Sequence, residues 1–136
     1  MGLEEGGHEL PAHAVVNGDF TRDSGERAVQ ALFDLQPDLT AVFALNDVMA
    51  IGAMAWLRQH GVRVPEDVSV AGFDDIPISR DLVPPLSTVR VPMAEMGARA
   101  LELALRPRSS CLRTEHMATE LVLRESTAEA RKPRLA

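Results

Sequence analysis

Two short apolar runs, each followed by a polar pair, constrain the fold of this 136-residue chain more than any other feature. Residues 41–45 (AVFAL) are apolar throughout and lead into the pair at 46–47, as expected of a strand buried on both faces in a parallel sheet. Residues 68–73 (VSVAGF) form a second strand-length run, which leads into the pair at 74–75. A helical stretch lies between the two runs. The order strand, helix, strand predicts an α/β fold with parallel strands.

Helix signals surround both runs. Residues 48–60 are predicted to form a helix that ends at Gly61, a residue favoured just after a helix. Before the first run, Asp23 and Glu26 have the spacing of a capping box and an apolar stripe extends to Leu35. Residues 14–16 are a short run that favours a strand. These elements predict an open, mainly parallel sheet flanked by helices, with three layers in the order α/β/α.

The second half of the chain has a different character. We predict one or two helical turns over 77–82, an extended crossover over 86–91 and an amphipathic helix over 93–105. Residues 120–124 are a last strand candidate, and the chain beyond Ser126 resembles a disordered tail.

The charge of the chain argues against direct binding to nucleic acid. The formal net charge is −6 and the sequence pI is about 5.1. A DNA-binding surface needs clustered Lys and Arg to replace the counterions of phosphate. The basic cluster at 131–134 surrounds a proline near the end of the chain and is typical of a solvated terminus.

The cysteine and histidine content points to a chain without a disulfide or a metal. Cys111 is the single cysteine, which fits a reducing, cytoplasmic setting. The four histidines are scattered without metal-ligand spacing, so we expect no metal and no cofactor. The first eleven residues do not resemble a signal peptide, and the longest apolar stretch, 48–57, is too short to cross a membrane.

Three residues are candidates for a small-molecule site: Phe20, Asn46 and Asp74. In open α/β sheets, ligands bind at the carboxyl ends of the strands, where these residues are predicted to lie. An aromatic ring can pack on the C–H face of a sugar or on a base. A carboxylate accepts hydrogen bonds from neighbouring hydroxyls, and an amide both donates and accepts them. The set therefore favours a sugar or a related small molecule.

Each candidate also has a structural interpretation. Asn46 can be a helix N-cap, the 74–75 pair can form a turn or a cap, and Phe20 can belong to the core. An enzyme is not indicated, because the chain lacks a G-x-S-x-G motif and a phosphate-binding loop. Asp74 and Asp75 are neighbours whose side chains would diverge in a strand, which argues against the paired carboxylates of a glycosidase.

Five sequence blocks resemble the LacI/GalR family of transcription regulators, in the order and at the spacing of that family. They are NGDFT at 17–21, TAVFALND at 40–47, VPEDVSVAGFDD at 64–75, PPLSTV at 84–89 and ELVLREST at 120–127. The resemblance implies a periplasmic-binding-protein-like effector domain of two lobes. It also implies that an N-terminal helix-turn-helix head and most of the first lobe are absent from this chain, so that operator DNA would be bound only through the missing head.

The resemblance assigns roles to particular residues. Phe20 matches the stacking aromatic of the family, and Asn46 and Asp74 match its polar effector contacts, whereas Asp47 and Asp75 are expected to be structural. It also implies a homodimer whose face includes Val48, Ile51, Gly52, Ala55, Ile78 and Leu82.

The resemblance further divides residues 1–127. Residues 1–88 correspond to the C-terminal lobe, 89–115 to a crossover and a helix that belongs to the N-terminal lobe, and 116–127 to a strand that returns; 128–136 would be a disordered tail. The helix at 93–105 then lacks its partner, and we expect the chain to self-associate through it. The function implied is effector sensing and dimerisation in a cytoplasmic transcription regulator. The alternative is a periplasmic sugar-binding protein of an importer.

Overall fold

The computed structural model describes residues 5–7, 9–107 and 114–130. Its elements follow one another along the chain in the order η1 (Ala12–Ala14), α2 (Arg22–Leu35), β1 (Ala41–Phe43), α3 (Asp47–Gln59), β2 (Ser69–Asp74), η2 (Pro77–Arg80), β3 (Ser87–Arg90), α4 (Met93–Leu105) and β4 (Glu120–Val122). None of the helices in these ranges is long and apolar enough to span a membrane.

The four strands form one open sheet in the order β1-β2-β3-β4. The pairs β1–β2 and β2–β3 are parallel, and β3–β4 is antiparallel. The carboxyl ends of β1 and β2 therefore lie at the same edge of the sheet, which is where the polar pairs 46–47 and 74–75 follow the strands. The predicted open, mainly parallel α/β class is confirmed, with one antiparallel strand at the end of the order.

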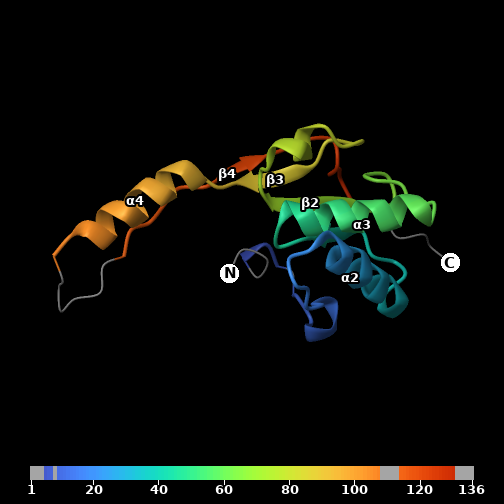
Figure 1. Ribbon diagram of the computed structural model, residues 1–136. Helices are drawn as coiled ribbons and strands as arrows, with labels where there is room; N and C mark the ends of the chain where they lie inside the picture. The colour runs from blue at the N-terminus through green and yellow to red at the C-terminus, as the bar shows by residue number, and fades with distance from the viewer. Residues whose placement is uncertain (1–4, 8, 108–113, 131–136) are drawn as a thin grey trace.

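Helices α2 and α3 pack against each other, and α3 packs on one face of the sheet against β2 (Figure 1). The core lies beneath them and includes Val29, Leu57, Val70 and Leu86, all of which are buried. The opposite face carries Phe43 of β1, which is 57% exposed, so the prediction that this strand is buried on both faces is wrong. Because no described helix packs on that face, the second helical layer that was expected is not found in the described ranges.

Two glycines set the distance between α2 and α3. A methyl group at Gly25 would overlap the backbone of Met49, and one at Gly52 would overlap the carbonyl oxygen of Arg22. The helices therefore touch through their backbones at this crossing. Close approach of this kind requires a residue without a side chain.

Helix α4 extends away from the rest of the molecule (Figure 1). It spans Met93–Leu105, the range predicted from the sequence, and contains no buried residue. Its apolar residues are exposed except Leu103, which is partly buried; Leu105, for example, is 77% exposed. Self-association through this helix stays a prediction.

Three local predictions differ from the structure. Residues 12–14 form a 3-10 helix and no strand covers 14–16, because η1 takes up the start of that run. Helix α2 begins two residues earlier than a cap at Asp23 would allow: Thr21 is its N-cap and accepts a hydrogen bond from the Ser24 amide. Ala128 was assigned to a disordered tail but exchanges hydrogen bonds with Ser69, and residues 131–136 lie outside the described ranges.

Candidate effector site

Asn46 connects the end of β1 to the start of α3. It is the N-cap of α3, and its side-chain oxygen accepts a hydrogen bond of 2.8 Å from the Met49 amide. Its side-chain nitrogen donates a bond of 3.1 Å to the carbonyl oxygen of Phe20. The capping interpretation is therefore correct. The amide keeps one N–H and one oxygen lone pair, which a ligand could use.

Phe20 is held in an exposed, left-handed conformation. Its φ is 63° and the residue is 61% exposed, so the interpretation that it belongs to the core is wrong. A positive φ is uncommon for a residue of this size and persists only where neighbouring contacts enforce it. Here the contact is the bond that Phe20 accepts from Asn46. Phe20 and Asn46, 26 residues apart, are thus brought together as the sequence predicts.

The residues beside Phe20 form a hydrogen-bonded turn. The Asp19 carboxylate accepts bonds from the amide and the hydroxyl of Thr21. Hydrogen bonds from Thr21, and then from Ser24, lower the pKa of Asp19 to about 2. The carboxylate is therefore charged throughout the neutral range and stabilises the turn that presents the ring of Phe20.

Asp74 ends β2, the strand next to Asn46. The register pairs Phe43 with Ala71, so continuing it by three residues places Asn46 level with Asp74. Asp74 is partly buried and has a φ of 114°. No hydrogen bond or ion pair to its carboxylate is found among the described residues. Burial, and then the nearby charge of Asp47, raise the pKa of Asp74.

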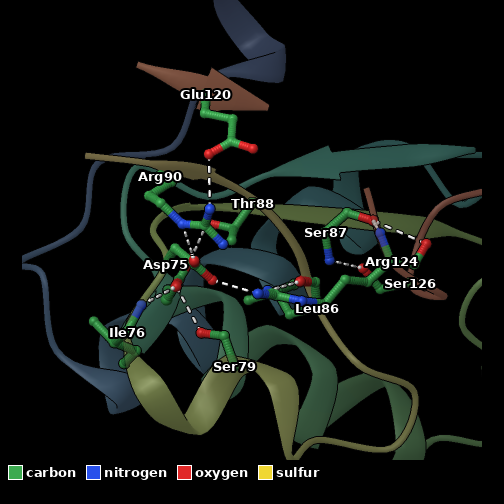
Figure 2. Close-up of polar contacts among 11 residues, drawn as sticks. Asp75, Ile76, Ser79, Leu86, Ser87, Thr88, Arg90, Glu120, Arg124 and Ser126 are labelled. Atoms are coloured by element: carbon green, nitrogen blue, oxygen red, sulfur yellow. Dashed lines mark hydrogen bonds and ion pairs between the residues drawn. The ribbon is translucent and has the colours of Figure 1, made fainter. Parts of the chain in front are cut away.

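Asp75 turns away from Asp74, as expected for neighbours at the end of a strand. Its carboxylate accepts bonds of 2.5 Å from Arg124 and 2.7 Å from Arg90 (Figure 2). Arg90 also bonds Glu120, at 2.7 Å, across the β3–β4 pair. Burial alone would raise the pKa of Asp75, but the bonds from Arg124 and Arg90 outweigh it and hold the pKa below its usual range. Asp75 is therefore a structural residue.

Asp47 joins three segments beneath the site. The residue is fully buried, and its carboxylate accepts bonds from the Ile76 amide at 3.0 Å, the Ser79 hydroxyl at 2.6 Å and the Thr88 hydroxyl at 2.5 Å. The three donors come from the turn after β2, from η2 and from β3. Asp47 therefore fixes the positions of the strand ends that carry Asn46 and Asp74. It has the structural role that the family resemblance implies.

The expected dimer face is only partly accessible. Gly52 and Ala55 are buried within the chain, Gly52 against the backbone of α2. Val48, Ile51 and Leu82 are partly exposed, and Ile78 is exposed. The dimer face therefore stays a prediction, and these four partly or fully exposed residues are the ones that could contact a second copy.

One cavity lined by a site residue lies to one side of the site. Its volume is about 920 Å³, and it is lined by Phe20 but by neither Asn46 nor Asp74. No group of three or more His, Cys, Asp or Glu residues that could hold a metal ion is found among the described residues.

The free carboxylate of Asp74 gives a test of the geometry. Burial disfavours the charged form of Asp74, so the folded chain binds a proton on this carboxylate more tightly than the unfolded chain does. The free energy of unfolding therefore increases as the pH falls through the raised pKa of Asp74. Asp74→Asn is therefore expected to increase the free energy of unfolding at pH 7 by less than about 1 kcal/mol. Urea denaturation measures the difference, and Asp81→Asn at an exposed position is the control. A variant less stable than the wild type at pH 7 would contradict the assignment.

Comparison with known proteins places the chain in a family. The periplasmic binding protein-like domain family matches residues 1–127, and the chain belongs to it. The transcriptional repressor CytR of Escherichia coli K12 is 44% identical over 91 residues, 67% of this chain and 27% of CytR. The ribose operon repressor of Haemophilus influenzae is 40% identical over 103 residues, 76% of this chain and 31% of the repressor.

Solved structures agree with this membership. A LacI family transcriptional regulator from Arthrobacter sp. FB24, in complex with lactose, superposes with a TM-score of 0.76 at 35% identity. The match covers 93% of this chain and 47% of the regulator. The chain thus spans less than a third of the two curated relatives and about half of the solved one. By name, these relatives are two transcriptional repressors and one transcriptional regulator.

Proposed function

We propose that this chain is the effector-binding and dimerising part of a LacI-type transcription regulator, with Phe20, Asn46 and Asp74 forming one wall of the effector site. The observation that carries the proposal is the hydrogen bond that joins Asn46 to the backbone of the exposed aromatic Phe20, beside the Asp74 carboxylate, for which the described part of the chain supplies no partner. An unpaired, partly desolvated carboxylate is costly in a folded protein, and perturbed groups of this kind cluster at functional sites.

The effector proposed is a carbohydrate. The ring of Phe20 would pack on the C–H face of a sugar ring, and Asp74 would accept hydrogen bonds from neighbouring hydroxyls. The free N–H of the Asn46 amide would donate to a further oxygen. Lactose is bound by the Arthrobacter regulator, which supports the same ligand class here.

Regulation would require more of the protein than these residues. We place residues 1–88 and 116–127 in the C-terminal lobe, and 89–115 in a crossover and helix that pack on the other lobe. Effector binding would close the lobes of a cytoplasmic homodimer and alter the spacing of DNA-binding heads that lie outside this chain, a coupling between two distinct sites. A sugar-binding protein of an importer is the weaker candidate, because the curated relatives named above are repressors.

The site is tested by NMR titration of the 136-residue chain with lactose and with ribose. One wall alone offers few contacts, so binding is expected to be weaker than micromolar. At millimolar sugar, the ring signals of Phe20 and the side-chain amide signals of Asn46 should shift together. The Phe20→Ala variant should lose the response of Asn46 without a change in fold.

Leu105→Ala, an exposed apolar residue on α4, is the matched control and should respond as the wild type does. Two results would contradict the proposal: shifts confined to residues away from the three site residues, or calorimetric binding of either sugar at micromolar affinity by the Phe20→Ala variant.

A further inference from the structure

The end of β2 and the residue after it adopt two consecutive left-handed backbone conformations. Asp74 has a φ of 114° and Asp75 a φ of 57°. Such values are uncommon for residues that carry a side chain, and they persist only where surrounding contacts enforce them. We call these two residues the β2 turn. Because the described part of the chain supplies no partner for the Asp74 carboxylate, the backbone of the β2 turn decides where that carboxylate points.

Contacts on both sides of the β2 turn hold its backbone. Before it, the parallel pairing of β2 with β3 places Asp74 in register with Arg90. After it, the Ile76 amide donates to the buried Asp47 carboxylate at 3.0 Å. Within it, the side chain of Asp75 is 3% exposed, and each of its two oxygens accepts a hydrogen bond from an arginine. The Asp75 carboxylate is therefore the side-chain anchor of the β2 turn.

Of the two arginines, Arg124 is the better placed to hold this anchor. Its guanidinium donates to Asp75 at 2.5 Å and to the carbonyl oxygen of Leu86 at 2.7 Å, so it ties the β2 turn to the residue that precedes β3 (Figure 2). Its side chain is 14% exposed, whereas that of Arg90 is 46% exposed. Water and salt weaken an ion pair less when it is less exposed. A planar guanidinium also holds two acceptors at fixed positions, which the ammonium group of a lysine does not do.

We infer that Arg124 is a positioning residue of the candidate effector site. By holding the Asp75 carboxylate, Arg124 keeps the β2 turn left-handed and so directs the free carboxylate of Asp74 to the edge of the sheet that carries Asn46. Arg124 does not touch the effector in this arrangement, because it acts through Asp75 and the backbone of Asp74. Arg90 has the same role with a smaller effect. The inference rests on the proposed function, since the direction of Asp74 matters for sensing only if Asp74 contacts the effector.

Arg124→Lys tests the inference first in the absence of sugar. Lysine keeps the positive charge but loses the planar pair of donors, so we expect the chain to fold while the β2 turn relaxes. The α- and β-carbon NMR chemical shifts of Asp74 and Asp75 depend on φ and ψ, and they should move toward the values of extended backbone. Arg90→Lys should produce a smaller change of the same kind, and it replaces Arg124→Lys in every test if that variant does not fold. Carbon shifts equal to those of the wild type would overturn the inference.

Sugar binding then separates a positioning role from a general structural role. In an NMR titration with lactose, Arg124→Lys should weaken binding by about three- to tenfold. If Arg124 acts through Asp74, the same substitution should weaken binding by less than about twofold in a chain that already carries Asp74→Ala. Equal weakening with and without Asp74→Ala would show that Arg124 stabilises the fold as a whole, and would also overturn the inference.

Arg99→Lys is the matched control, because Arg99 donates to Glu102 at 2.9 Å on the exposed helix α4. It should change neither the carbon shifts of the β2 turn nor the affinity for lactose. A wild-type chain that bound no sugar would contradict the proposed function. The carbon shifts of the sugar-free chain would still decide whether Arg124 holds the β2 turn, so the two proposals fail separately.

Discussion

Asp47→Ala is expected to lower the free energy of unfolding by about 3–5 kcal/mol. The substitution removes the acceptor for three donors at once: the Ile76 amide and the hydroxyls of Ser79 and Thr88. Because Asp47 is fully buried, water cannot replace the carboxylate without opening the structure. Urea denaturation followed by circular dichroism measures the loss.

Asp38→Ala is the control for that experiment, because Asp38 is exposed and precedes β1. Its free energy of unfolding should stay within about 0.5 kcal/mol of the wild type. If both substitutions cost the same, the hydrogen bonds to Asp47 would not hold β2, η2 and β3 together in the way described.

Gly52→Ala is expected to cost about 2–3 kcal/mol, a large effect for the addition of one methyl group. The methyl would overlap the carbonyl oxygen of Arg22, which is backbone and cannot move as a side chain can. Helices α2 and α3 would have to separate, and buried neighbours such as Val29 would lose contacts. Thermal unfolding of the purified variant measures the change.

The same substitution at Gly97 gives the matched control. A methyl group there meets no atom within 4 Å, because α4 is exposed along its length. Alanine favours a helix over glycine by about 1 kcal/mol, so Gly97→Ala should increase the helical signal of the chain and leave the main unfolding transition in place. Equal losses for Gly52→Ala and Gly97→Ala would contradict the close crossing of α2 and α3.

Elements with a strong local pattern could be predicted from the sequence. The amphipathic period of residues 93–105 predicts the extent of α4, and Pro107 marks where the helix ends. The apolar runs at 41–45 and 68–73 locate β1 and β2 to within two residues, and Gly61 follows α3 as predicted. In each of these cases, the residues that decide the structure are close together in the chain.

Features that depend on distant residues could not be predicted in the same way. Asp47 bonds residues 29 to 41 positions away, and a pattern of spacing carries no signal for such contacts. The exposure of Phe43 arises because nothing described covers that face, although its apolar run is typical of a buried strand. The start of α2 was misplaced because Thr21 and Asp23 are both good caps and only the backbone geometry decides between them.

The candidate site lies between these two cases. The rule that ligands bind at the carboxyl ends of parallel strands brings Asn46 and Asp74 to one edge, and the register agrees. The bond from Asn46 to Phe20 could not be foreseen, and neither could the left-handed conformation of the aromatic residue. The sequence therefore predicted which residues form the candidate site, whereas the orientation of their side chains and backbone could be seen only in the structure.

The attachment of α4 has a mechanical consequence. The helix joins the rest of the chain through the end of β3 at Arg90 and the start of β4 at Glu120, and these two residues are tied to each other and, through Arg90, to Asp75. A helix of this length measures about 20 Å, so a rotation of about 10° at its base moves its tip by about 3–4 Å. Arg90 links the base of α4 to Asp75, which is one residue from Asp74. A small rotation of α4 at Arg90 would therefore be a much larger displacement at the far end of the helix.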